Sequence, residues 1–180
     1  MLHNCSLWNV ATVFFDNPNK AFELIEISRK INLAHTSVKK HLLTLIDLKI
    51  ITKGTVNFGN KANPCYSANK KDHLFIHYKK IYNLDCLKNS ALIEYIENKC
   101  QPNSIILFGS FQKGEDTFDS DIDLFVESNE DNLNLEKYEE KLNRKIQIHF
   151  KNKFKKYPNE LKNNLINGIV LSGFLEGYNA

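Results

Sequence analysis

Two aspartates and a glycine–serine pair are the residues of this chain with the clearest capacity for chemistry. Gly109 and Ser110 end the apolar run Ile105–Phe108, and Asp121 and Asp123 follow after ten intervening residues. Side chains two positions apart on a strand share a face, so the two carboxylates would lie together. Close carboxylates repel each other unless a cation lies between them, and Mg²⁺ prefers carboxylate and phosphate oxygens. Because a tight turn can present backbone N–H groups to phosphate, the pattern predicts a nucleoside triphosphate site with magnesium.

Each half of this pattern is common by itself, because Gly-Ser often follows a strand and Asp-x-Asp often begins one. Here the two halves lie between two apolar runs, with Gly114 and Ser120 in the polar loop that separates them. That combination favours a functional site over two unrelated turns.

In these residues the chain resembles the minimal nucleotidyltransferases of the DNA polymerase beta superfamily, in their archaeal and bacterial form. That family has Gly-Ser, ten residues and then Asp-x-Asp, and residues 111–120 are those ten here. The matching positions are Phe108, Gly109, Ser110, Gly114, Ser120, Asp121, Ile122, Asp123 and Leu124. The basic residue that usually follows Gly-Ser is Phe111 here, with Lys113 two residues later.

The resemblance implies an activity and a set of ligands. Family members transfer a nucleoside monophosphate from a triphosphate to a hydroxyl, so we expect AMP, or another nucleotide, to pass from ATP or another NTP to a protein or nucleic acid. The nucleotide-binding residues would be Gly109, Ser110, Lys113 and Ser120. The catalytic residues, which are also the ligands of Mg²⁺ or Mn²⁺, would be Asp121 and Asp123.

The same resemblance exposes one departure from the family. A third carboxylate normally lies on the next strand, and the matching residue here is Gln147. An amide is a neutral ligand and cannot act as a base, so a second metal ion would bind more weakly. His149 shares the strand face but suits Mg²⁺ poorly, and Glu127 lies roughly 13 Å past Asp123 by strand rise. Whether catalysis survives with Gln147 stays open.

Charge is divided unevenly along the chain. Residues 1–90 contain 13 Lys or Arg and 6 Asp or Glu, for a net charge of +7. Residues 91–180 contain 11 Lys or Arg and 15 Asp or Glu, for a net charge of −4. A basic half suits a polyanion such as DNA, although two solvated surfaces without a ligand are the alternative.

The basic half has the pattern of a winged helix-turn-helix domain, which we place at residues 1–70. The expected elements are helices at residues 5–15, 25–31 and 38–48 and a hairpin over residues 50–68. Thr36 or Ser37 is the expected N-cap of the third helix, which would enter the major groove of DNA. The DNA-binding residues would be Thr36, Ser37, Lys39, Lys40 and His41 on this helix and Lys53 and Lys61 on the hairpin. A winged helix used for protein contact or dimerisation is the alternative.

The rest of the chain is expected to hold a helical linker and the nucleotidyltransferase-like domain. The linker is placed at residues 71–100, with a break near Asn83, and a metal role for its His73 and His77 stays open. The domain is placed at residues 101–180, and the fold class is α+β with a small mixed sheet. Its expected elements are strands at residues 105–108, 122–126 and 146–150 and helices at residues 133–144 and 157–166.

Composition favours a cytoplasmic protein. The four cysteines are scattered and form no C-x-x-C, which is typical of a reducing compartment. No apolar run approaches the ~18 residues that span a bilayer, so no membrane partner is expected.

Two functions follow from these features. The first is a Mg²⁺-dependent nucleotidyltransferase with a DNA-binding domain, whose acceptor could be a HEPN-type toxin of a toxin–antitoxin pair. The second is a DNA-binding transcription regulator whose nucleotidyltransferase-like domain is inactive and senses nucleotide or mediates partner contacts. A homodimer is compatible with both, and a module that only dimerises is a third alternative.

Overall fold

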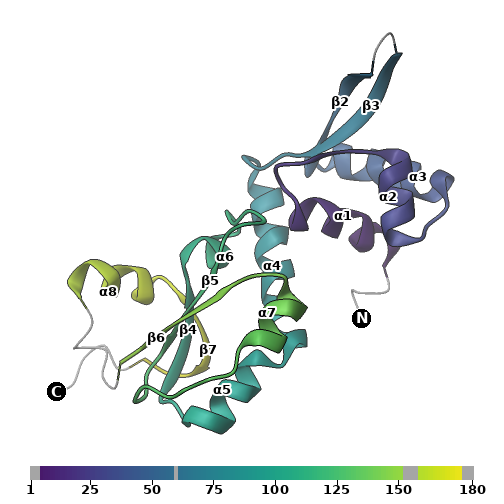
Figure 1. The fold of residues 1–180 in the computed structure, drawn as a ribbon. Coiled ribbons are helices and arrows are strands. Elements are labelled where there is room, and N and C mark those ends of the chain that lie inside the picture. The colour runs from purple at the N-terminus through teal and green to yellow at the C-terminus, as the bar shows by residue number, and fades with distance from the viewer. Residues whose placement is uncertain (1–4, 59–60, 152–157, 176–180) are drawn as a thin grey trace. The chain divides into compact units, whose positions relative to one another are not determined.

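A computed structural model of the chain describes residues 5–58, 61–151 and 158–175, and Figure 1 shows its helices and two sheets. The predicted α+β class is confirmed. The chain divides into two compact units, Met1–Tyr82 and Asn83–Ala180. This division falls inside the segment expected to be a linker, and helix α4 (His73–Ser90) contributes residues to both units. Among the described residues, no helix is long and apolar enough to cross a membrane.

The first unit contains three helices and a three-stranded antiparallel sheet in the order β1-β3-β2. The helices are α1 (Ser6–Asp16), α2 (Leu24–Ile31) and α3 (His35–Asp47). The strands are β1 (Ala21–Glu23), β2 (Ile51–Phe58) and β3 (Lys61–Ala68). The hairpin and the three helices were predicted, whereas β1 was not, because a strand of three residues leaves almost no periodic signal.

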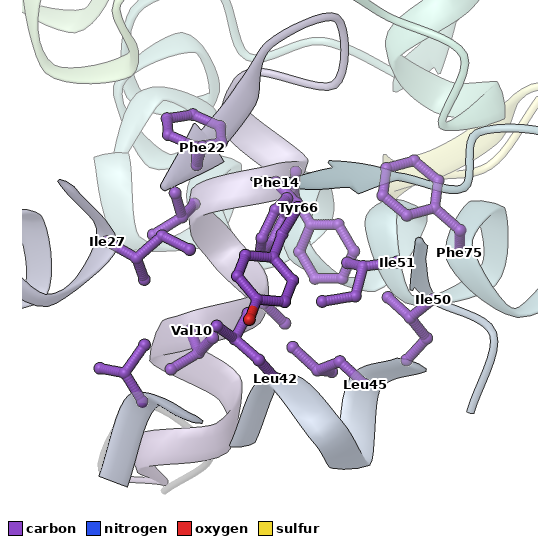
Figure 2. Close-up of a cluster of buried hydrophobic side chains, with 14 residues drawn as sticks. Val10, Phe14, Phe22, Ile27, Leu42, Leu45, Ile50, Ile51, Tyr66 and Phe75 are labelled. Carbon is purple, nitrogen blue, oxygen red and sulfur yellow. The ribbon is translucent and has the colours of Figure 1, made fainter. Parts of the chain in front are cut away.

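Apolar side chains from all three helices and the hairpin form the core of this unit (Figure 2). Phe14 of α1 packs edge-on against Phe22 of β1, with ring centroids 5.6 Å apart. Leu42 and Leu45 of α3 are buried in the same cluster, as the apolar stripe of this helix predicts. The outer surface of α3 is left to polar and charged side chains, apart from the exposed Leu43.

The turn between α2 and α3 is set by one asparagine and one serine. Asn32 adopts a left-handed conformation with φ 50°, and its N–H donates to the carbonyl of Ser28. Asparagine tolerates this conformation better than most residues do. The Ser28 hydroxyl donates to the carbonyl of Leu33 at 2.5 Å, which holds the turn closed.

Helix α3 begins earlier than its sequence predicted. Its N-cap is Ala34, with no side-chain capping bond, so the prediction that Thr36 or Ser37 caps the helix is wrong. The N–H of Val38 already donates to the carbonyl of Ala34 at 3.0 Å, which places both polar residues inside the first turn. Burial of Val38 and Leu42 therefore outweighs the local capping preference.

The break expected near Asn83 is also wrong. Helix α4 continues to Ser90, and α5 (Leu92–Cys100) follows after Ala91, which has φ 62°. Asparagine usually competes with helical backbone bonds through its own side chain. Here the Asn83 amide donates instead to Asp116 and to the carbonyl of Phe111, each at 2.8 Å, so it does not disturb the helix.

The second unit is built on a four-stranded sheet in the order β6-β5-β4-β7. The strands are β4 (Ser104–Phe108), β5 (Ile122–Val126), β6 (Ile146–Phe150) and β7 (Ile169–Gly173). The helices besides α4 and α5 are α6 (Gly109–Lys113), α7 (Glu136–Leu142) and α8 (Asn159–Ile166). The three predicted strands are confirmed, and β5 and β6 run parallel because the segment containing α7 crosses over between them. Helix α7 is shorter than expected.

Helices cover the two faces of this sheet unequally. Side chains of Ile122, Leu124 and Val126 pack with α5 and α7 in the larger cluster. Phe125 points to the opposite face and packs with Leu165 of α8 in a cluster of only four buried residues. The alternation of β5 therefore places the side chain of Asp123 on the face that carries α8.

Candidate functional site

Three neighbouring strands bring the predicted site residues to one end of the sheet. Gly109 directly follows β4, whose last residue, Phe108, pairs with Asp123 of β5. On the other side of β5, Asp123 pairs with Gln147 of β6. Asp121 immediately precedes β5, so Gly109 and these three polar residues meet where β4 ends and where β5 and β6 begin.

Gly109 packs its backbone directly against Asp123. Its φ is 78°, a backbone conformation that residues other than glycine rarely adopt. A Cβ atom at this position would overlap Asp123 Oδ2 and lie 3.2 Å from Asp123 Cγ. Glycine is therefore needed twice here, for the turn into α6 and for the close approach of backbone and carboxylate.

The negative charges of the two aspartates repel each other. Asp123 is half-buried, and burial raises the pKa of its carboxyl. A charge on His149 lowers that pKa, the charge on Asp121 raises it, and the net effect is a raised pKa. Negative charge at Asp123 is thus disfavoured by its surroundings, chiefly by burial.

Gln147 contacts Asp121 from the next strand. Its Nε2 donates to Asp121 Oδ2 at 2.5 Å, so an amide hydrogen bond partly satisfies this carboxylate. Glu127 lies at the other end of β5 and accepts a bond from the Ser104 hydroxyl at 3.2 Å, which keeps it away from the site. His149 lies on the strand face of Gln147, with its ring 5.4 Å from that of Phe108.

The remaining predicted nucleotide-binding residues lie on the loop and helix between β4 and β5. Ser110 is in the first turn of α6, where backbone N–H groups have no intrahelical partner. Lys113 is exposed in the last turn of α6. The Ser120 hydroxyl accepts a bond from the N–H of Thr117 at 2.9 Å, so it closes the turn that leads into Asp121.

A buried polar network beneath this loop was not predicted. Arg144 Nη2 lies 3.2 Å from Asp116 Oδ2, and both side chains are almost completely buried. Asn83 donates to the other oxygen of Asp116, and Arg144 also donates to the carbonyl of Phe118. One available signal was that Arg144 is one of only two arginines in a chain with 24 Lys or Arg residues. Arginine is preferred over lysine where a planar, buried ion pair is needed.

A depression of about 540 Å³ lies beside Asp121. Its wall includes the loop that leads to Asp121, helix α7 and the start of β6. The lining residues are Phe118, Asp119, Ser120, Asp121, Glu136, Glu139, Glu140, Asn143, Arg144 and Lys145.

The predicted DNA-binding residues of the first unit fall into three groups. Thr36, Lys39 and Lys40 are exposed on α3, Lys53 is exposed on β2, and Ser37 is partly buried. His41 is half-buried and shares a 2.8 Å hydrogen bond with the Ser6 hydroxyl of α1, so it contributes to packing instead. The side chain of Lys61 lies outside the described residues.

The two histidines of α4 do not form part of a metal site in the described structure. The side chain of His73 is 87% exposed, and its Nδ1 lies 3.8 Å from Asp72 Oδ1. The ring of His77 contacts that of Tyr78. No group of three or more His, Cys, Asp or Glu residues within the described ranges is arranged to hold a metal ion.

Comparison with known proteins bears on the second unit. Residues 90–171 match the nucleotidyltransferase domain family. This segment contains helix α5, strands β4, β5 and β6, and every polar residue of the site around Asp123. The match supports nucleotidyl transfer as the general activity of this domain, and such domains generally use a nucleoside triphosphate and a divalent metal ion.

Other comparisons add little to this assignment. No curated protein matches the chain. One solved structure with similarity is described as "Possible transcriptional regulator from Methanosarcina mazei Go1" and is 16% identical. The similarity covers 54% of this chain and 80% of that one, with a TM-score of 0.36, which is too low to establish a shared fold.

Proposed function

We propose that the second unit binds a nucleoside triphosphate with Mg²⁺ or Mn²⁺ and transfers its nucleoside monophosphate, AMP in the first instance, to an acceptor hydroxyl. The observation that carries this proposal is the meeting of Gly109, Asp121 and Asp123 at one end of the sheet within the nucleotidyltransferase match. Gly109 and Ser110 would bind the β- and γ-phosphates through their backbone N–H groups, and Gly109 has no side chain to hinder a close approach.

The donor set fits one divalent ion. Asp121 immediately precedes β5 and Asp123 lies within it, and the charge on Asp121 raises the pKa of Asp123. Carboxylate oxygens of this kind suit Mg²⁺. When bound, the ion would neutralise charge on the phosphates and orient them for attack. Lys113 and Ser120 would contribute near the phosphates, Lys113 through its exposed charge and Ser120 by fixing the turn before Asp121.

Gln147 should limit the rate of transfer at this site. Its amide can hold Asp121 in place but cannot take a proton from the attacking hydroxyl. We therefore expect transfer to be slow compared with a site that has a third carboxylate.

Transfer can be tested with each of the four α-labelled nucleoside triphosphates. The full chain is incubated with Mg²⁺ and with protein, RNA and DNA acceptors, HEPN-type proteins among them. Wild-type chain should label one acceptor class, and Asp121→Ala should abolish the label while leaving the circular dichroism spectrum unchanged. Equal labelling by wild type and variant, or none with any acceptor, would refute the proposed activity.

The first unit supports a second proposal, which is DNA binding by a winged helix-turn-helix domain with a role in transcription control. The supporting observation is the exposed, basic surface of α3, with Thr36, Lys39 and Lys40 near its N-terminal end. Lys53 on β2 would contact phosphate, which positions a protein without specifying sequence. Affinity for DNA should fall steeply with salt, and substitution of Lys40 and Lys53 by alanine should reduce that salt dependence. Unchanged affinity and slope would argue for protein contact or dimerisation instead.

A further inference from the structure

We propose that Asn83, Asp116 and Arg144 are positioning residues for the magnesium–nucleotide site. They fix the loop that joins the phosphate-binding turn after β4 to the metal-binding carboxylates at the start of β5. This inference rests on the proposed transferase function and adds to it the residues, all outside the Gly-Ser and Asp-x-Asp motifs, that set the geometry of that site.

The segment between helix α6 and strand β5 has little secondary structure of its own. Helix α6 ends at Lys113, and β5 begins at Ile122. Backbone bonds in between are local, such as that from the N–H of Ser120 to the carbonyl of Thr117 at 3.1 Å. Pairing of β4 with β5 fixes the two ends of this segment but not its path. Side chains from other elements therefore set that path.

Asn83 of α4 ties helix α6 to the middle of this loop. Its Nδ2 donates to the carbonyl of Phe111 in α6 and to Asp116 Oδ1 in the loop, each at 2.8 Å. One amide NH₂ group has two protons, so both bonds can form at once. Asn83 is 2% exposed and Asp116 is 1% exposed. They therefore act through the loop and not by touching a bound nucleotide.

Arg144 ties the same loop to the start of β5. Its Nη2 lies 3.2 Å from Asp116 Oδ2, and its Nη1 donates to the carbonyl of Phe118. The carbonyl of the next residue, Lys145, accepts the N–H of Ile122 at 2.8 Å. Because Ile122 lies between the two aspartates of the Asp-x-Asp motif, one short segment holds the loop through a side chain and the carboxylates through the backbone.

The chemistry of this network favours positioning over stability as its purpose. Removing two charges from water costs free energy, so a buried ion pair stabilises a fold little more than apolar side chains of the same size would. Hydrogen bonds between charged groups are short and directional, and a planar guanidinium fixes two of them at once. Such bonds hold a loop to a narrow range of positions, which matters because a displacement of about 1 Å can cost an active site about a hundredfold in rate.

Binding of ATP to the full chain, with and without Mg²⁺, tests this inference. The test variants are Arg144→Lys and Asn83→Ala. Lysine keeps a positive charge beside Asp116 but has no fixed fork to bond both Asp116 and the carbonyl of Phe118. Alanine at position 83 removes both side-chain bonds that tie α6 to the loop.

The matched control is Ser104→Ala. It removes a bond from a buried hydroxyl to Glu127, in the same unit but at the opposite end of β5 from Asp121. It should lower thermal stability as the test variants do while leaving the loop intact. Calorimetric titrations are made at a temperature where the circular dichroism spectrum of each variant matches that of wild type, and Arg144→Lys alone decides the test if Asn83→Ala does not fold.

The measured quantity is the factor by which Mg²⁺ strengthens ATP binding. This factor depends on contacts with the phosphate-binding turn and the carboxylates at the same time, so it is sensitive to the distance between them. In the test variants it should fall about fivefold or more below that of wild type, while affinity for ATP without Mg²⁺ changes about twofold or less.

Ser104→Ala should keep the wild-type factor. A wild-type factor in Arg144→Lys, or an equal loss in Ser104→Ala, would overturn the inference and leave the transferase proposal standing. Absence of any Mg²⁺ effect in the wild-type chain would refute both.

Discussion

The two units of this chain differ in net charge and in how many polar side chains they bury. Residues 1–82 carry 12 basic and 5 acidic side chains, for a net charge of +7. Residues 83–180 carry 12 basic and 16 acidic side chains, for a net charge of −4. Among the described residues of the first unit, the buried polar side chains are Ser28 and Lys79, within an otherwise apolar core. In the second they are Asn83, Ser90, Ser104, Asp116 and Glu127. The first unit therefore keeps most of its charge at the surface, whereas the second builds specific polar bonds into its interior, and those of Asn83 and Asp116 lie beneath the loop of its site.

This difference determines how each unit should respond to substitution. Surface charges can be removed from α3 with little change in stability, because exposed charges contribute little to folding. A buried carboxylate cannot be removed in the same way, because its partner is left charged and unpaired. The predictions below test this contrast.

Asp116→Ala should have the largest effect on stability. It leaves the buried Arg144 without its carboxylate, and breaking such a pair costs about 3–5 kcal/mol. Chemical denaturation should show the second unit unfolding earlier while the first unit is unaffected. Asp119→Ala is the matched control, since this exposed residue lies in the same loop. A similar small loss for both variants would mean that the network does not support the loop.

Gln147→Asp should separate metal binding from folding. The new carboxylate would lie opposite Asp123 and beside Asp121, so three negative charges would crowd together without a cation. We expect lower thermal stability without Mg²⁺, recovery when Mg²⁺ is added, and transfer increased about tenfold. Gln147→Leu removes the bond to Asp121 without adding charge, so Mg²⁺ should stabilise it less than it stabilises Gln147→Asp. A Gln147→Asp variant that ignores Mg²⁺ would count against a metal site here.

Lys40→Ala should change DNA binding and His41→Ala should change stability, although the two residues are adjacent. Lys40 is exposed, so its loss should weaken DNA binding and reduce the salt slope by about one, with little change in stability. His41 is bonded to Ser6, so its loss should lower stability by about 1 kcal/mol. Thermal melting and binding titrations over a salt series distinguish the two. The comparison fails if His41→Ala alters the salt slope and Lys40→Ala does not.

Glu139 should give the smallest effect on stability, and this effect should be present at neutral pH and disappear in acid. A hydrogen bond from Lys145 and another from the N–H of Ile146 lower its pKa from the ordinary value of 4.5. A lowered folded-state pKa stabilises the protein above the unfolded value, and this contribution disappears as pH falls through the folded value. Wild type should therefore exceed Glu139→Gln in stability at neutral pH, and the difference should shrink below about pH 4.5. A difference that is constant from neutral pH to acid would show that ionisation of Glu139 is not involved.

Local pattern was enough to predict some elements and not others. Strands β5 and β6 were predicted at their observed bounds from their patterns between polar segments. Strand β5 is apolar except for Asp123, and in β6 the polar Gln147 and His149 alternate with apolar residues. The start of α3 was missed because burial of Val38 in the core outweighs the capping preference of Thr36 and Ser37. The uninterrupted α4 was missed because Asn83 bonds the distant Asp116 instead of its own backbone. The pairing of Arg144 with Asp116 joins residues 28 positions apart, and no periodic signal records it.

The site followed from sequence in its residue types but not in its contacts. The spacing of Gly109 and Asp123 predicted that they belong together, and the structure shows why glycine is needed, since a Cβ atom would overlap the carboxylate. The contact of Gln147 with Asp121 depends on the register of β6 against β5. The role of His41 depends on packing against α1. Both are tertiary features that a single sequence does not specify.

Calorimetric titration of ATP into the full chain, with and without Mg²⁺, tests the central claim most directly. Wild type should bind ATP with Mg²⁺ and at least tenfold more weakly without it, because Asp121 and Asp123 repel phosphate unless a cation lies between them. Asp123→Asn should lose the Mg²⁺-dependent part of the affinity, and Asp119→Asn should retain it. Equal affinity with and without Mg²⁺, or unchanged binding in Asp123→Asn, would contradict a magnesium–nucleotide site at this end of the sheet.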